Sequence, residues 1–86
     1  MTNLARIILY GAEFCRFCQQ AKTLLEKSKV NFTYIDVENE ESQQQLNIIQ
    51  KKYGYSKIPM VFIDKEFIGG YTELYKLVDT KQINLD

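Results

Sequence analysis

Apolar residues recur along the chain with two different periods, and these periods predict alternating strands and helices. Residues 6–10 and 32–37 are short runs rich in β-branched, leucine and aromatic side chains, which is typical of buried strands. Between them, apolar residues spaced three or four apart predict a helix over about 15–29. A strand, a helix and a second strand in this order favour a parallel βαβ unit.

The second half of the chain predicts a helix and then a hairpin. Apolar positions at helical spacing indicate a helix over 40–53, with Asn39 as its N-cap and Gly54 as its C-terminal stop. Residues 60–63 and 66–68 predict two strands, and the two residues between them fit a tight turn.

A last helix is predicted after Gly69 and Gly70. Thr72 is its expected N-cap, and Glu73 falls in the first turn, where the helix dipole favours a negative charge. The predicted order is therefore β-α-β-α-β-β-α. We expect an α/β fold in which a four-stranded mixed sheet is flanked by three helices, in a single domain, 1–86.

Composition narrows the classes of function. Lysine and arginine together number 11, as do aspartate and glutamate, so no net charge favours nucleic acid or an acidic membrane as a partner. The sequence has no apolar run of about 18 residues and no basic leader with a small-residue cleavage site. We therefore expect a cytoplasmic monomer that binds neither nucleic acid nor membrane.

The two cysteines of the chain, Cys15 and Cys18, stand at the predicted start of the first helix. Unpaired N–H groups and the positive end of the dipole favour a thiolate there, so we expect the pKa of Cys15 to fall from about 8.5 to roughly 3.5–7.5. Cys15 would then be a nucleophile, and Cys18 would attack any mixed disulfide that Cys15 forms. With no histidine, the chain lacks a closed tetrahedral set of zinc ligands, so we expect no metal. Two core cysteines without a redox role are the structural alternative.

Pro59 stands between the second predicted helix and the third predicted strand and is the single proline of the chain. Proline is common at such a strand start. The alternative is a cis Ile58–Pro59 bond, which would turn the Ile58 backbone toward Cys15 and leave it free to pair with an extended peptide that carries a thiol.

Together these motifs resemble the glutaredoxin family. The matching stretches are Cys15-x-x-Cys18 after a first strand, Lys57-Ile-Pro-Met-Val-Phe-Ile63 in the place of the family's Thr-Val-Pro strand, and Phe67-Ile-Gly-Gly-Tyr-Thr-Glu-Leu74 at its Gly-Gly helix start. The resemblance extends from about Arg6 to Val78. It implies a thioredoxin fold, a cis Pro59, and glutathione as the reductant and as the group removed from glutathionylated proteins. No tightly bound cofactor is expected.

Carried over by position, the resemblance assigns roles to single residues. It makes Cys15 the nucleophile and Cys18 the resolving thiol. The Ile58 backbone would hold the cysteinyl part of glutathione, and Thr72 with Glu73 would take its γ-glutamyl end. The full set of expected glutathione contacts is Phe17, Lys57, Ile58, Pro59, Tyr71, Thr72 and Glu73.

Three positions depart from the family pattern. Arg16-Phe17 replaces the usual Pro-Tyr between the cysteines, and Phe17 would either pack on glutathione or belong to the core. Ala12 stands where a lysine or arginine is common, so Arg16 is a candidate for tuning the pKa of Cys15, with an ordinary exposed arginine as the alternative. Lys57 stands where threonine is frequent and could meet the glycyl carboxylate of glutathione.

The leading hypothesis is a glutathione-dependent thiol-disulfide oxidoreductase that reduces protein disulfides and glutathione mixed disulfides. Some glutaredoxins hold a [2Fe–2S] cluster between two protomers with two glutathiones. Binding of such a cluster is one alternative function, and it is compatible with Arg16 standing where the family usually has proline. A second alternative is a glutaredoxin-like protein reduced by thioredoxin reductase, which the missing cation at Ala12 leaves open.

Overall fold

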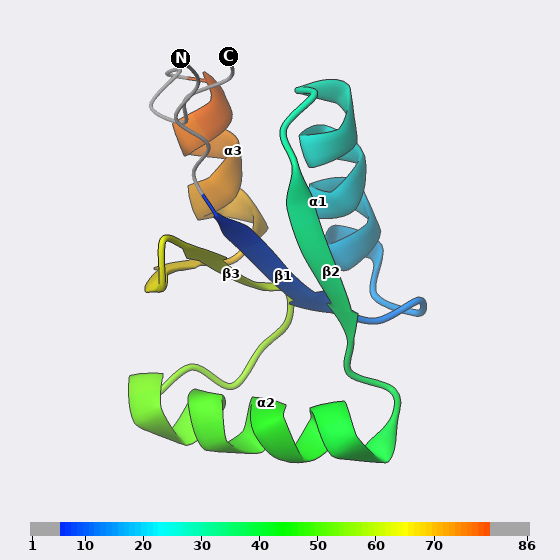
Figure 1. The fold of residues 1–86 in the computed structure, drawn as a ribbon, viewed down its shortest axis with the longest axis vertical. Coiled ribbons are helices and arrows are strands. Elements are labelled where there is room, and N and C mark those ends of the chain that lie inside the picture. Colours follow the sequence, from blue (N-terminus) through cyan, green and yellow to red (C-terminus); the bar gives the residue numbers. More distant parts are fainter. Residues whose placement is uncertain (1–5, 80–86) are drawn as a thin grey trace.

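The computed structural model describes residues 6–79 and has the predicted order of elements. These are β1 (Ile7–Gly11), α1 (Arg16–Lys27), β2 (Phe32–Asp36), α2 (Glu40–Tyr53), β3 (Met60–Ile63), β4 (Glu66–Gly69) and α3 (Tyr71–Asp79). The strands form one sheet in the order β2-β1-β3-β4, in which β1 is parallel to β2 and antiparallel to β3, and β4 is antiparallel to β3 (Figure 1). This is the mixed sheet of a thioredoxin-like fold, as the sequence predicts.

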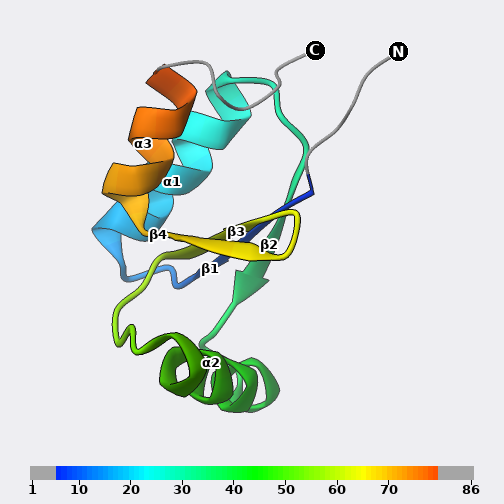
Figure 2. The ribbon, with the colours of Figure 1, turned by 90° about the vertical axis from the view of Figure 1, so that its left-hand side faces the viewer.

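Helices cover both faces of the sheet, because successive side chains of a strand point to opposite faces. On one face, strand residues pack with α1 and α3 in a cluster of Ile7, Leu9, Ala21, Leu25, Val61 and Leu74. On the other face, α2 covers a second cluster of Tyr10, Ala12, Val37, Leu46, Met60 and Phe62. Figure 2 shows α1 and α3 together on one side of the sheet and α2 alone on the other.

Local backbone signals account for most element boundaries. The Asn39 side chain accepts the Ser42 N–H at 2.8 Å and begins α2, and Gly54 ends this helix with φ of 62°, so both predicted caps are confirmed. The turn between β3 and β4 places Asp64 and Lys65 at positive φ, which suits the right-handed twist of a hairpin. Within residues 6–79, no helix combines the length and the apolar composition that crossing a bilayer requires.

Two predicted helix ends are wrong. α1 ends at Lys27 rather than at Lys29, because Lys29 has a φ of 58° and has left the helical conformation. α3 begins at Tyr71, so Thr72 lies inside the first turn and is not the N-cap. The Gly70 N–H donates instead to the Glu73 carboxylate at 2.8 Å, which is the capping-box contact of a glutamate three residues into a helix.

The first prediction concerns the core beneath the site. Leu9 of β1 has an exposed fraction of 0%, whereas Ile48 of α2 is 69% exposed. We expect Leu9→Ala to lower the free energy of unfolding by about 2–5 kcal/mol through loss of burial and the cavity it leaves. Ile48→Ala, the matched control, should change it by less than about 0.5 kcal/mol. Urea unfolding at constant m-value measures both, and equal losses would contradict the assignment of the core.

Candidate active site at the start of α1

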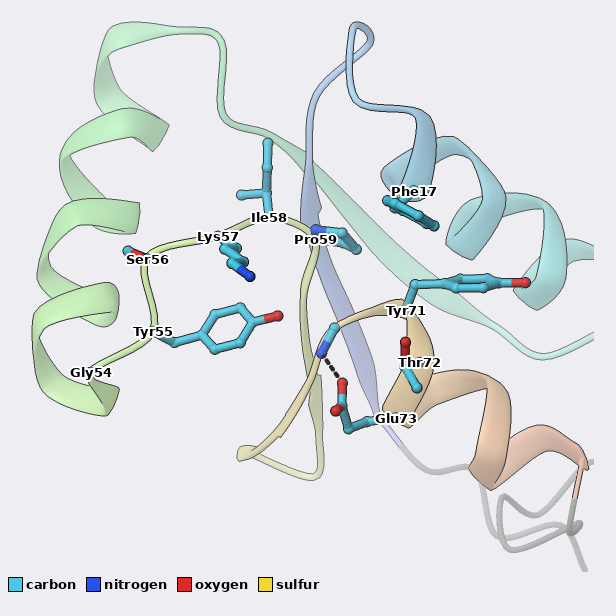
Figure 3. A pocket seen from close by; sticks show the side chains of 11 residues that line it. Phe17, Gly54, Tyr55, Ser56, Lys57, Ile58, Pro59, Tyr71, Thr72 and Glu73 are labelled. Carbon is cyan, nitrogen blue, oxygen red and sulfur yellow. Dashed lines mark hydrogen bonds between the residues drawn. The ribbon is translucent and has the colours of Figure 1, made fainter.

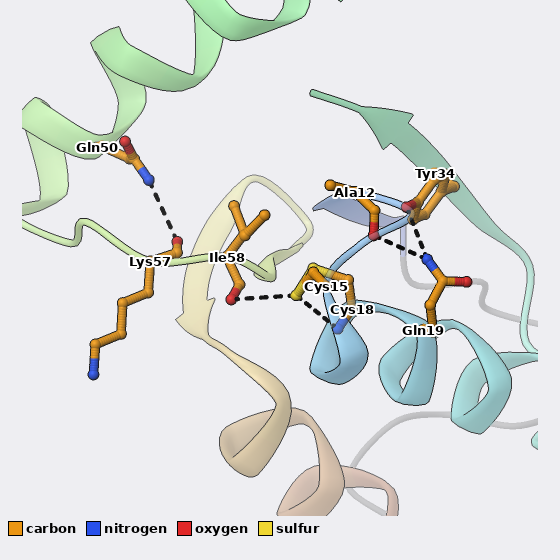
Figure 4. Close-up of a disulfide and its surroundings, with 8 residues drawn as sticks. All are labelled: Ala12, Cys15, Cys18, Gln19, Tyr34, Gln50, Lys57 and Ile58. Atoms are coloured by element: carbon orange, nitrogen blue, oxygen red, sulfur yellow. Dashed lines mark hydrogen bonds between the residues drawn. A yellow bond between two sulfur atoms is a disulfide. The ribbon is translucent and has the colours of Figure 1, made fainter. Parts of the chain in front are cut away.

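Cys15 is the N-cap residue of α1, at the end of the short loop that connects β1 to this helix. Its backbone is extended, with φ of −90° and ψ of 111°, and its Sγ accepts the Cys18 N–H at 3.1 Å. The two cysteines are joined as a disulfide, with their Cα atoms 5.1 Å apart (Figure 4). The predicted placement of the pair at a strand-to-helix junction is confirmed. A sulfur that already accepts a backbone N–H is favoured in its charged form when the pair is reduced.

Cys18 lies behind Cys15, with an exposed fraction of 0%, while Cys15 is half-buried. Cys18 packs on the backbone of Gly11 and beside the Tyr34 ring. A Cβ at Gly11 would lie 2.9 Å from Cys18 Cβ and 3.2 Å from Tyr34 Cε1, so a larger residue cannot be accommodated without displacing the pair. An incoming disulfide therefore meets Cys15 first, and Cys18 can act only from the protein side.

Gln19 holds the loop that leads to Cys15. Its side-chain amide donates to the Ala12 carbonyl at 3.0 Å and lies 3.5 Å from the Tyr34 hydroxyl, and the Cys15 N–H donates to the same Ala12 carbonyl at 3.2 Å (Figure 4). This contact could not be predicted from the sequence, because a glutamine on a helix is usually solvated. The amide fixes the turn on which the reactive sulfur stands.

Ile58 faces Cys15 from the other side. The Ile58–Pro59 peptide bond is cis, as the resemblance implied. The carbonyl oxygen of Ile58 lies 3.8 Å from Cys15 Sγ, a distance at which a reduced thiol can donate to it (Figure 4). The backbone just before β3 is thus within reach of anything bound to the Cys15 sulfur.

A cleft of about 540 Å³ opens beside this backbone, within the size range of small-molecule sites. Figure 3 shows its walls, which come from α1, from the segment between α2 and β3, and from the start of α3. The lining residues are Phe17, Gly54, Tyr55, Ser56, Lys57, Ile58, Pro59, Gly70, Tyr71, Thr72 and Glu73. The structure therefore brings all seven expected glutathione contacts together around one cleft.

Aromatic rings form one wall of the cleft. The Phe17 side chain is 58% exposed, and its ring centroid is 5.9 Å from that of Tyr71. The alternative that Phe17 is a core residue is wrong. A half-exposed ring beside a reactive sulfur gives a ligand an apolar surface without blocking the approach to Cys15.

The opposite wall carries the polar groups. Lys57 is exposed, and the Gln50 amide donates to its backbone carbonyl at 3.4 Å (Figure 4). Tyr55, which the sequence did not single out, comes so close to α3 that a Cβ at Gly70 would lie 2.6 Å from its hydroxyl. Burial, and to a smaller extent the negative charge of Glu73, raise the pKa of Tyr55 above its ordinary value. Its hydroxyl therefore stays protonated at neutral pH and can donate into the cleft (Figure 3).

Arg16 lies outside this cleft. It is exposed and lines a neighbouring groove along α1 with Gln20, Lys27 and Tyr71. Its proposed effect on the pKa of Cys15 stays a prediction. Within residues 6–79, no group of three or more histidine, cysteine, aspartate or glutamate side chains is arranged to hold a metal ion.

Known proteins resemble this chain in sequence and in fold. The family model described as Glutaredoxin matches residues 7–68. Glutaredoxin 1 of Rickettsia prowazekii is 36% identical over 74 residues, covering 86% of this chain and 78% of its own length. Glutaredoxin 3 of Escherichia coli K12 is 32% identical, with 86% and 87% covered. The solution structure of the dithiolic glutaredoxin 2-C-Grx1 of Trypanosoma brucei brucei superposes with a TM-score of 0.83 at 25% identity, with 95% and 88% covered.

The second prediction compares two tyrosines whose pKa is raised by burial, of which only Tyr55 is also affected by a carboxylate. A carboxylate disfavours a nearby phenolate and so raises the pKa of the phenol. We expect Glu73→Gln to lower the pKa of Tyr55, which nevertheless stays above its ordinary value of 10.0 because burial is the larger cause. Tyr10, raised by burial alone, is the internal control and should not shift. Titration of ring carbons by NMR measures both, and an unchanged Tyr55 would contradict the geometry of this wall.

Proposed function

The chain belongs to the glutaredoxin family of thiol-disulfide oxidoreductases, and we propose that it uses glutathione as its reductant and as the group it removes from protein mixed disulfides. The observation that carries the proposal is the cleft near Cys15, which is surrounded by an aromatic wall, the backbone segment before β3, a lysine and a helix start. Each of these features matches one part of the tripeptide.

The cysteinyl part of glutathione would lie along Ile58, whose carbonyl is 3.8 Å from Cys15 Sγ, so that its sulfur reaches the nucleophile. Lys57 would meet the glycyl carboxylate as a point charge. The γ-glutamyl carboxylate would lie at the start of α3 beside Thr72, where backbone N–H groups and the dipole favour an anion. Glu73, whose carboxylate accepts the Gly70 N–H, would attract the γ-glutamyl ammonium group.

The reaction on a glutathionylated protein needs one cysteine. The Cys15 thiolate attacks the glutathione sulfur, a Cys15–glutathione disulfide forms, and the protein thiolate leaves with the electron pair of the broken bond. A second glutathione thiolate then attacks the glutathione sulfur of this intermediate. Oxidised glutathione leaves, and Cys15 returns as a thiolate, a good leaving group when its negative charge is stabilised.

Reduction of a protein disulfide uses both cysteines. Cys15 attacks one sulfur of the substrate and forms a mixed disulfide, and Cys18 then attacks Cys15 Sγ from the protein side. The reduced substrate leaves, and the Cys15–Cys18 disulfide remains. Two glutathiones reduce this disulfide in two exchanges.

We also propose that the protein acts as a monomer in the cytoplasm, where a glutathione pool keeps the cycle running in this direction.

The third prediction separates the two cysteines. Cys15→Ser should abolish removal of glutathione from a glutathionylated peptide, because no thiolate remains at the helix start. Cys18→Ser should retain that activity but lose reduction of a protein disulfide, which needs the resolving thiol. Turnover coupled to glutathione reductase measures the first reaction, and the reverse pattern would contradict the assigned roles.

The same wild-type protein tests the choice of reductant. We expect turnover with glutathione and glutathione reductase, and at least tenfold slower turnover with thioredoxin reductase, because the cleft offers charged groups for both ends of a tripeptide. Faster turnover with thioredoxin reductase would overturn the glutathione proposal and leave the thiol-disulfide chemistry intact.

The fourth prediction concerns the lysine of the cleft. Lys57→Gln should lower kcat/KM for glutathione by about two- to fivefold, the effect of losing one exposed ion pair. Lys52→Gln is the matched control, because it removes the same charge from α2 at a side chain that lies over the Tyr53 ring, 5.5 Å from its centroid. Equal losses in the two variants would show that Lys57 acts only through the net charge.

A further inference from the structure

A second recess begins at Ile58 and extends away from the glutathione cleft. This groove, of about 450 Å³, lies between the loop before α1 and the α2 side of the sheet, and its walls include Phe14, Val37, Glu38, Leu46 and Ile58. Phe14 directly precedes Cys15 in the chain, and the Ile58 carbonyl lies 3.8 Å from Cys15 Sγ. Both recesses thus border Ile58, and the groove also borders the residue that precedes Cys15.

The groove has an apolar part, formed by Phe14, Val37, Leu46 and Ile58, and a polar part, formed by Glu38, Gln43, Gln50 and Ser56. Val37 and Leu46 are buried members of the α2-side core and form its floor, and the half-buried Cys15 and Ile58 pack on the same cluster. Phe14 is 77% exposed, more than any other large apolar side chain of the described residues. Neither the glutathione cleft nor the core accounts for this ring, which offers a contact surface to a partner attached at Cys15.

The charges around the groove are negative. Glu38 is the one charged residue among its described walls. Glu13 directly precedes Phe14 in the chain, and its side chain is exposed. The cleft on the other side of Ile58 carries both Lys57 and Glu73, whereas the groove carries charge of one sign only, which favours a cation.

We propose that the groove formed by Phe14, Val37, Glu38, Leu46 and Ile58 docks the polypeptide that flanks the substrate cysteine, and that it selects a segment with lysine or arginine beside that cysteine. The inference rests on the proposed function in one respect: with glutathione in the cleft, the protein part of a mixed disulfide needs another surface at Cys15. The apolar floor would bind the segment, and Glu38 with Glu13 would supply the preference for a cation.

A direct attack assay tests the groove without glutathione. The Cys18→Ser protein is mixed with a short peptide whose cysteine is disulfide-bonded to thionitrobenzoate. The Cys15 thiolate attacks the peptide sulfur, a Cys15–peptide disulfide forms, and thionitrobenzoate leaves with the electron pair of the broken bond and is followed by its absorbance. Two peptides are compared, identical except that two lysines or two glutamates flank the cysteine.

At low salt we expect the lysine peptide to react at least about threefold faster than the glutamate peptide, which is the effect of one or two exposed ion pairs. The ratio of the two rates should approach one at about 1 M salt, because salt screens these charges. The thiolate itself also favours a cationic peptide, so two variants of equal charge are compared. Glu38→Lys should bring the ratio close to one. Glu66→Lys should leave it unchanged, because Glu66 pairs with Ile63 at the far end of the β3–β4 hairpin.

Equal ratios in Glu38→Lys and Glu66→Lys would overturn the inference, because the preference would then come from the thiolate or the net charge. A preference for the glutamate peptide would also overturn it. A second copy of the chain bound in the groove would overturn it as well. In that case the rate of attack per protein molecule would fall as the protein concentration rises, and Glu38→Lys would restore it. If the protein keeps the charge preference but shows no turnover with glutathione, the proposed function would be contradicted, whereas docking in the groove would still be supported.

Discussion

The contact between Cys15 Sγ and the Cys18 N–H, 3.1 Å apart at the start of α1, is the interaction on which the site depends. An N-cap is usually an oxygen of serine, threonine, aspartate or asparagine, which accepts a helix N–H and does nothing else. Here the accepting atom is the sulfur of Cys15, which forms a disulfide with Cys18. In the reduced pair, the same N–H and the helix dipole would favour a negative charge on this sulfur, the charge that the proposed nucleophile needs.

Ile58 divides the surroundings of that sulfur into two recesses. The strand β3 brings it there, because Met60 pairs with Tyr10 at the end of β1 from which the loop to Cys15 departs. Lys57 faces the cleft on one side, and Glu38 lines the groove on the other. Under the proposed function, glutathione would contact the cleft and the protein half of a mixed disulfide would contact the groove. The pairing of Met60 with Tyr10 is what places Ile58, which borders both recesses, beside Cys15.

The features of the fold that could be predicted from the sequence are those that depend on residues close together along the chain. The order of elements, the Asn39 and Gly54 caps and the cysteines at a helix start all follow from neighbours along the chain. The start of α3 was misplaced because Thr72 and Glu73 are both capping residues, and the choice depends on where the backbone leaves β4. The roles of Gln19 and Tyr55 could not be predicted, since each contacts a segment, around Tyr34 or Gly70, that only the folded sheet brings near.

The two charges of the cleft argue for a small zwitterionic ligand over a generic protein segment. Glu73 is held in place by the Gly70 N–H, so its negative charge stays at the α3 end of the cleft, while Lys57 projects from the segment before β3 (Figure 3). An internal peptide segment has neither a free ammonium group nor a free carboxylate on its backbone to answer both. Glutathione has both on its γ-glutamyl end and a second carboxylate at the other, so the signs of its charges are those that Glu73 and Lys57 would attract, which supports the proposed ligand.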